Sequence, residues 1–192
     1  MCLDTGGGFG DAQDMNAKTV ISFWFEEIDP QLWFARNEEF DQLLRARFSD
    51  LHDQVSKGET YLWRNSPEGR LAEILVLDQF SRNMFRGSAK AFASDAQALV
   101  LAQEAVSQGD DMELPLQQRG FLYMPYMHSE SPLIHDQAMK LFAQEGLENS
   151  YKFEVAHKKI IDQFGRYPHR NAVLGRESTT AELEFMKEHP GF

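Results

Sequence analysis

The stretch that decides the fold is SPEGRLAEILVLDQFSRN, residues 66–83. Ser66 belongs to a residue type that caps helices, and Pro67 suits the first helical position because the N–H that it lacks would have no partner there. Residues 71–77 are almost all apolar, so the helix that they form is apolar on nearly every side. We therefore predict a central helix that is buried among other helices.

The rest of the chain repeats the helical pattern. Leu, Ala and Met total 44 residues, whereas the β-branched Val and Ile total 13, and this balance favours helices over strands. The sequence therefore predicts an all-α fold of about eight antiparallel helices, arranged either as layered helix pairs or as a compact bundle. Apolar residues recur at helical spacing in residues 20–28, 40–55, 71–77, 98–106, 116–127, 133–142, 153–164 and 183–186.

Several positions predict where helices begin, bend or end. Ser94 with Gln97, and Thr179 with Glu182, have the spacing of capping boxes. Pro125 falls inside the fifth helix and supplies no N–H, so we expect that helix to bend or break there.

Length and charge narrow the class of protein. The chain has 192 residues and a net charge of −11. We expect a flexible, Gly-rich leader over residues 1–15 and a single all-helical domain over residues 16–192. The negative charge argues against nucleic acid and acidic membranes as partners, and no stretch is long and apolar enough to cross a bilayer. The single cysteine, Cys2, excludes an internal disulfide, so we expect a cytoplasmic protein.

Polar residues interrupt the apolar pattern directly after the central helix. Asp78 and Arg82 are four residues apart, share one helix face and can pair, while Asn83 lies near the expected helix end. In a functional interpretation, Asp78 orients Arg82, and Arg82 and Arg86 present donors to a carboxylate or a phosphate. In the structural alternative, the pair only stabilises the end of the helix.

A second polar cluster follows the fifth helix and contains His128 and Glu130. A histidine and a carboxylate near a helix end can transfer protons or supply metal ligands. The alternative is that both cap the irregular backbone around Pro125. No HExxH or comparable ligand spacing is present, so we predict neither a metal nor another cofactor.

The third cluster departs from the overall charge. Residues 152–176 hold six bases and two acids, a local balance of +4. His157 falls between apolar helical positions and is expected to face the interior or its edge. The loop after this helix is rich in donors and turn formers, which suits a functional loop, although its side chains can also serve only to satisfy helix-end carbonyls. Its candidate ligand-binding residues are Arg166, His169, Arg170, Asn171 and Arg176.

The ordered motifs of this chain resemble the bacterial "domain of unknown function 924" family from about residue 19 to residue 192. The resemblance implies an all-α fold similar to tetratricopeptide-type helix-pair superhelices, and it implies no established activity. The motifs that carry it are VISFWF (20–25), LDQFSRN (77–83) with FRG (85–87), AFASD (91–95), FLYMP (121–125) with HSE (128–130), and FGRYPHRN (164–171) with LGREST (174–179).

We expect the three polar clusters to meet in one concave site. The first hypothesis is a pocket for a small anionic ligand, a phosphate or a carboxylate, bound by arginines that Asp78 and Asn171 orient. The second is an enzyme that uses His128, Glu130 or His169 for acid–base chemistry. The third is a helical scaffold whose groove holds a peptide or protein partner. The residues assigned to ligand binding are Asp78, Arg82, Asn83, Arg86, Arg166, His169, Arg170, Asn171 and Arg176.

Overall fold

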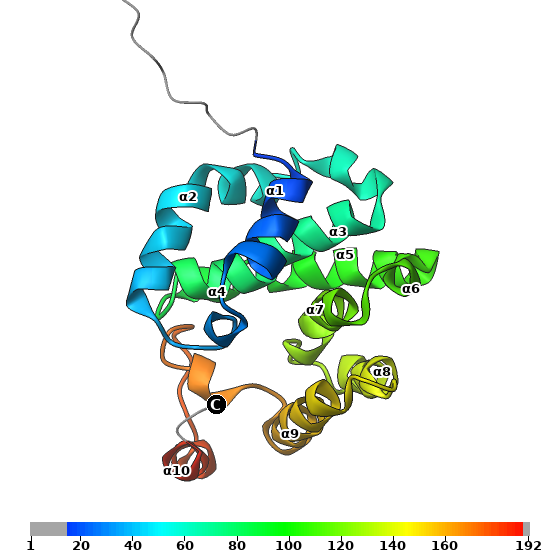
Figure 1. Cartoon of the computed structure of the whole chain (residues 1–192). Coiled ribbons are helices and arrows are strands. Elements are labelled where there is room, and N and C mark those ends of the chain that lie inside the picture. The colour runs from blue at the N-terminus through cyan, green and yellow to red at the C-terminus, as the bar shows by residue number, and fades with distance from the viewer. Residues whose placement is uncertain (1–14, 190–192) are drawn as a thin grey trace, which may run out of the picture.

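A computed structural model describes residues 15–189, and within that range the chain forms helices and no strand (Figure 1). The all-helical prediction is therefore confirmed. The expected leader lies outside the described residues except for Met15. The α-helices are α1 Ala17–Ser22, α2 Glu38–Ser56, α3 Pro67–Leu75, α4 Ser81–Met84, α5 Asp95–Gln108, α6 Asp110–Glu113, α7 Leu116–Met127, α8 Pro132–Phe142, α9 Glu148–Phe164 and α10 Thr180–Glu188. The π-helical turns are η1 Phe23–Glu27 and η4 Val76–Phe80, and the 3-10 turns are η2 Pro30–Leu32, η3 Tyr61–Asn65, η5 Ala89–Phe92 and η6 Pro168–Arg170.

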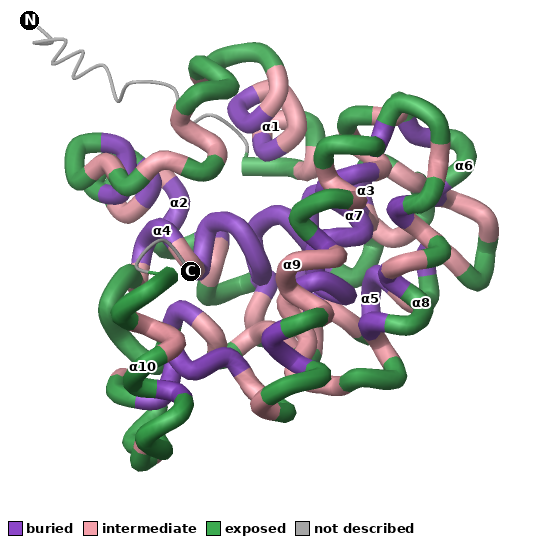
Figure 2. The backbone as a smooth tube through the Cα atoms, turned by 90° about the horizontal axis from the view of Figure 1, so that it is seen from below, coloured by how far each residue is buried: buried purple, intermediate pink, exposed green. Residues whose placement is uncertain are grey.

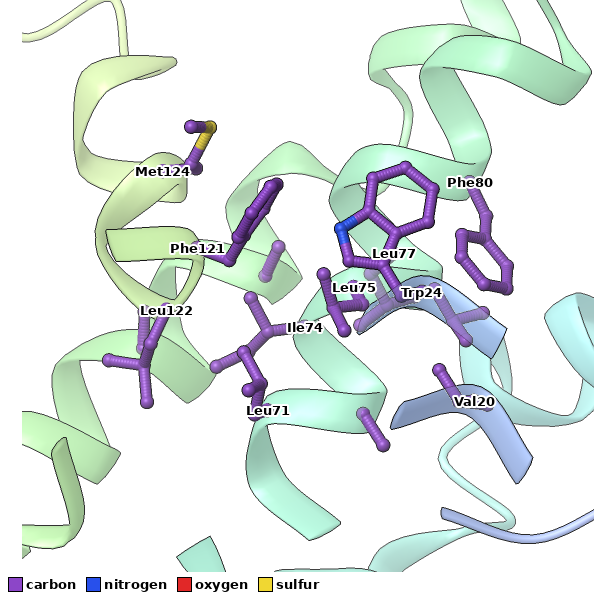
Figure 3. Close-up of a cluster of buried hydrophobic side chains, with 14 of the residues drawn as sticks. Val20, Trp24, Leu71, Ile74, Leu75, Leu77, Phe80, Phe121, Leu122 and Met124 are labelled. Carbon is purple, nitrogen blue, oxygen red and sulfur yellow. The ribbon is translucent and has the colours of Figure 1, made fainter. Parts of the chain in front are cut away.

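Helix α3 lies at the centre of the hydrophobic core, as its sequence predicts. Leu71, Ile74 and Leu75 are completely buried, and Figure 3 shows them between Trp24 on one side and Leu122 of α7 on the other. Full burial of such a side chain contributes about 1.5–3 kcal/mol relative to exposure. The apolar run therefore accounts for a large share of the stability of the fold.

Helix α3 packs on several helices that are not adjacent to it in sequence, whereas α7, α8 and α9 pack on one another in sequence order. Helix α3 contacts α1, α5 and α7, and the chain then continues through α7 against α8 and α8 against α9. Helix α10 lies apart from this succession, at the edge of the molecule (Figure 1), and it is largely exposed (Figure 2). The tetratricopeptide-like detail stays a prediction.

The helix caps confirm one sequence signal and correct another. Thr179 and Glu182 form the predicted capping box at the start of α10. Ser94 makes no capping hydrogen bond, and Gln97 donates instead to the carbonyl of Val55. The predicted box at Ser94 is wrong because its backbone, at φ −99° and ψ 4°, is not in the extended conformation that directs a cap side chain at the helix start.

Pro125 does not break its helix. Helix α7 continues past it to Met127, so of the two expected outcomes, a bend or a break, the break is wrong and the bend stays a prediction. Pro125 lies in the last turn, where a missing N–H removes one backbone hydrogen bond and leaves the preceding turns intact.

A small second cluster holds the C-terminal part of the chain. Ile160, Ile161 and Tyr167 are buried together, and Phe164 and Phe185 pack against them. The rings of Phe164 and Phe185 lie 5.2 Å apart. Helix α10 is therefore attached through the end of α9 and the following loop rather than through the main core.

Candidate functional site

The candidate site begins where the central helix changes its winding. Helix α3, the π-helical turn η4 and α4 form one helical run, and Asp78 and Gln79 lie within the π turn. A single π turn inserts one extra residue, changes the face on which side chains emerge, and occurs frequently at functional sites. All five residues of this turn are buried, and Asp78 has only 1% of its surface exposed.

Two side chains hydrogen-bond to the Asp78 carboxylate, and a third, Arg82, forms an ion pair with it and donates a hydrogen bond to the backbone carbonyl of Asp78. Its Oδ1 lies 2.7 Å from Nδ1 of His128 and 2.9 Å from a terminal nitrogen of Arg82. Its Oδ2 accepts from the amide of Gln79 at 2.6 Å. Burial alone would raise the pKa of Asp78, but the positive charge of Arg82 and these hydrogen bonds outweigh burial and lower that pKa. Asp78 is therefore a buried carboxylate in its charged form.

His128, at the end of α7, has one ring nitrogen occupied and one open. Because the Asp78 carboxylate accepts, Nδ1 carries the proton, and the lone pair of the neutral ring lies on Nε2. Within residues 15–189, Nε2 has no hydrogen-bond partner, and it is not among the buried unpartnered atoms. The side chain is 15% exposed. Burial and then the charge of Arg82 lower the pKa of His128, so the ring is neutral at neutral pH.

A shared carboxylate joins Arg82 to Arg170. Asp95, at the start of α5, accepts two hydrogen bonds of 2.9 Å from Arg82 and one of 3.1 Å from Arg170. Arg170 also donates to the carbonyl of His128 at 3.0 Å. Its guanidinium lies between the rings of Phe92 and Tyr167, 4.6 and 4.5 Å from their centroids. One network therefore links η4, α4, α5, α7 and η6.

Two further histidines flank the buried ring of Tyr167, with ring centroids 5.7 Å away for His157 and 5.5 Å away for His169. Burial lowers the pKa of His157 to about 4. Although His169 reaches solvent, desolvation on its inner side and then the charge of Arg170 lower its pKa as well. The surroundings of His128 therefore contain neutral imidazoles at neutral pH.

Glu130 belongs to a neighbouring ion pair. Arg176 donates to both of its carboxylate oxygens, at 2.6 and 2.9 Å, and the backbone N–H of Tyr167 donates to Oε1 at 2.8 Å. Burial would raise the pKa of Glu130, but these bonds lower it. Asn171 orients the same arginine, because its Oδ1 accepts from Nε of Arg176 at 2.9 Å. This geometry leaves Glu130 poorly suited to act as a base.

The remaining predicted site residues lie in separate ion pairs. Arg166 holds α10 through two hydrogen bonds to Glu182, at 2.7 and 2.9 Å. Arg86 pairs with Asp41 of α2 at 2.6 and 2.9 Å and also donates to the side chain of Asn83. The structure thus brings Asp78, Arg82, His128, Arg170 and His169 together and places Arg166, Arg86 and Asn83 elsewhere.

A second histidine–carboxylate pair, which the sequence did not point to, lies close to the first. His135 and Glu154 are both completely buried, and Nδ1 of His135 is 2.7 Å from Oε1 of Glu154. The other ring nitrogen, Nε2, is 2.8 Å from the carbonyl oxygen of Ser129 and 3.2 Å from the hydroxyl of Tyr167. Both nitrogens of this ring are therefore engaged inside the protein.

Sequence reasoning also missed Asp95, Gln79 and Tyr167 as members of the network. Each stands in a motif that carries the family resemblance, and that membership is the signal that could have found them.

Neither a metal site nor a membrane helix is evident in the described part of the chain. No group of three or more His, Cys, Asp or Glu side chains there is placed to hold a metal ion. No helix among residues 15–189 combines the length and apolar character needed to cross a bilayer.

Two comparisons with known proteins found matches. The chain is similar over 90% of its length to a solved structure from Agrobacterium tumefaciens, the protein of unknown function ATU0120, with 35% sequence identity, a TM-score of 0.85 and 97% of that chain covered. No curated protein matches the chain. The model of the family described as bacterial protein of unknown function, DUF924, matches residues 20–190. The chain therefore belongs to the DUF924 family of bacterial proteins.

Proposed function

We propose that the chain is a proton-transferring enzyme in which His128 is the general base and Asp78 is the positioning residue behind it. One observation carries the proposal: His128 donates Nδ1–H to a buried, ionised carboxylate and presents an unpartnered Nε2. A carboxylate in this position sets the tautomer, orients the ring and stabilises the imidazolium that forms when the base takes a proton.

The same geometry limits the types of reaction that His128 can support. In enzymes with a serine or cysteine nucleophile, the hydroxyl or thiol is hydrogen-bonded to the base, whereas Nε2 of His128 has no such partner within residues 15–189. The proton therefore comes from a bound water molecule or from the substrate itself. It moves to Nε2, and it leaves later to the leaving group or to solvent. Base-assisted hydrolysis and proton abstraction are the two reaction types that fit.

Acylation by diethyl pyrocarbonate tests the base directly, because this reagent attacks unprotonated imidazole nitrogens. We expect mass spectrometry to find His128 modified rapidly, with a pH dependence whose midpoint lies below the ordinary histidine pKa of 6.5. His135 should remain unmodified in the folded chain. Modification of His128 no faster than that of His135 would contradict the proposal.

A substrate screen tests the catalytic part. Chromogenic esters, amides and phosphomonoesters are offered to the wild type, to His128→Gln and to the control His189→Gln, directly after α10. We expect any turnover to fall about 100-fold in His128→Gln and to persist in the control, since general bases contribute about 10²–10⁴ to the rate. Turnover that survives in His128→Gln would exclude this residue as the base.

A second candidate function, binding of a small anion, has one observation in its favour. Arg82 and Arg170 share the single carboxylate of Asp95, and the Nε of Arg170 is buried without a hydrogen-bond partner. Burial and then the charge of Arg82 lower the pKa of Arg170, and a nearby anion would relieve that repulsion. The general base has stronger support, because every arginine assigned to ligand binding already pairs with a carboxylate.

Inorganic phosphate distinguishes the two candidates. If the anion site exists, phosphate raises the melting temperature of the wild type more than chloride does at equal ionic strength. Arg170→Lys should lose that difference, because lysine keeps the charge and loses the planar fork that matches phosphate. Equal shifts of the melting temperature with phosphate and chloride would contradict the anion site, and the general base would then be the only proposal.

A further inference from the structure

A hollow lies between α9 and α10, away from the Asp78–His128 pair. It has a volume of about 680 Å³ and adjoins a second hollow of about 460 Å³. Its floor is apolar and includes Ala156 and Ile160 of α9 and Phe185 of α10. Helix α10 is tied to the fold near one end of the hollow, by the Phe164–Phe185 contact. Within residues 15–189, a strip of apolar surface between the two helices therefore stays uncovered.

The two sides of this hollow carry opposite charges. Lys152 and Lys159 line it from α9, and Glu184 and Glu188 line it from α10. All four residues are exposed. Within residues 15–189, Lys152, Lys159 and Glu188 form no ion pair. Glu184 pairs only with the exposed Lys187. Both sides are therefore free to meet charges on another molecule.

We propose that this hollow, the α9–α10 groove, docks an amphipathic helix of a partner protein. The apolar face of that helix lies on the floor, an acidic edge faces Lys152 and Lys159, and a basic edge faces Glu184 and Glu188. The lysines are seven residues apart, which is about 10 Å along α9, so acidic residues at the same spacing would match them. The glutamates, one turn apart, match basic residues at positions i and i+4.

The charge pattern favours such a helix over other occupants. A small anion or an acidic extended peptide placed between α9 and α10 would meet the glutamates as well as the lysines. A helix can segregate the two signs along its two edges and also fill an apolar floor. Lying beside α9, it would extend the succession of neighbouring helices by one member. This inference is independent of the proposed acid–base function.

A pair of designed peptides tests the groove. The matched peptide is a helix of about twelve residues with Leu at positions i, i+3, i+4 and i+7, Glu along one edge and Lys along the other. The control peptide has the same composition with the two charged edges exchanged. We expect fluorescence anisotropy with the full chain to show about tenfold tighter binding of the matched peptide, and NMR shifts at Ile160 and Phe185.

Charge reversal on the protein sharpens the test. The double variant Lys152→Glu with Lys159→Glu changes only exposed side chains, so it is expected to fold, which circular dichroism verifies. It should reverse the preference between the two peptides. Three results would overturn the inference: equal affinity for both peptides, no binding of either, or an unchanged preference in the double variant. A dimer in sedimentation that Phe185→Asp abolishes would also overturn it, since a second copy of the chain would then occupy the groove.

Discussion

Two histidine–carboxylate pairs lie close together in this molecule, and they differ in what the second ring nitrogen does. In both pairs Nδ1 lies 2.7 Å from a buried carboxylate oxygen. In His135 the Nε2 atom contacts the carbonyl of Ser129 and the hydroxyl of Tyr167. In His128 the same atom has no partner within the described residues. One pair is closed within the fold, and the other opens towards solvent.

The carboxylates of the two pairs also differ, both in their neighbours and in the direction in which the pKa is shifted. Asp78 also forms an ion pair with Arg82 and accepts a hydrogen bond from Gln79, and its pKa is lowered. Glu154 has a buried second oxygen without a hydrogen-bond partner, and burial raises its pKa. The Ser129 carbonyl requires a proton on Nε2 of His135, whereas ionised Asp78 requires one on Nδ1 of His128. Distance alone therefore does not identify a reactive pair; the occupancy of the outer nitrogen and the charge of the carboxylate do.

Removing each histidine gives the largest expected contrast. His135→Ala leaves Glu154 buried without its partner, and loss of one member of a buried pair destabilises a protein by about 3–5 kcal/mol. His128→Ala leaves Asp78 bonded to Arg82 and Gln79, so we expect a loss of about 1–2 kcal/mol. Urea unfolding measures both values. Equal losses would contradict the distinction between a structural and a reactive pair.

The pH dependence of stability tests the third histidine of this region. His157 has a pKa of about 4 in the folded chain and an ordinary value of 6.5. Between these values the unfolded chain binds the extra proton, so the contribution is complete above pH 6.5 and is lost as the pH falls towards 4. At about 1.4 kcal/mol per pKa unit the loss is roughly 3 kcal/mol.

Replacement of His157 isolates this effect from the other histidines. We expect His157→Gln to flatten the pH dependence of the free energy of unfolding between pH 6.5 and pH 4. An unchanged slope in the variant would show that His157 is not buried as a neutral ring.

The smallest expected effect concerns Glu130. Its pKa is lowered in the folded chain, so its ion pair with Arg176 stabilises the fold above the ordinary value of 4.5, and the contribution is lost as the pH falls below that value. Glu130→Gln is expected to lower stability at neutral pH by about 1 kcal/mol, because the pair is partly exposed. The rate of His128 acylation should not change. A slower rate would place Glu130 in the proton-transfer machinery.

The apolar pattern predicted the fold well. Leu71 and Ile74 lie in a run whose burial follows from composition alone, and the structure places that run at the core. The π-helical turn around Asp78 has no comparable signal, because residues 71–77 are apolar on nearly every side and a change of helix face there leaves no visible break in the pattern. The corrections at Ser94 and Pro125 have a similar origin, since both depend on local backbone geometry.

The candidate site was predicted in part. Asp78 and Arg82 pair as their spacing indicates, and His128, 50 residues away in sequence, joins them as the joint-site hypothesis requires. The local excess of positive charge in residues 152–176 was less informative. Arg170 pairs with Asp95 and Arg166 pairs with Glu182, and both acids lie outside that stretch of sequence. Tertiary contacts, rather than local sequence, decide which arginines remain available for a ligand.

The most direct test of the open His128 base is a long-range ¹H–¹⁵N NMR spectrum of the imidazole rings, recorded across a pH titration. We predict that His128 carries its proton on Nδ1 at neutral pH and gains the second one only below pH 6.5, while Nε2 of His135 donates its proton to the Ser129 carbonyl. A neutral His128 with the proton on Nε2, or an imidazolium at neutral pH, would contradict the account.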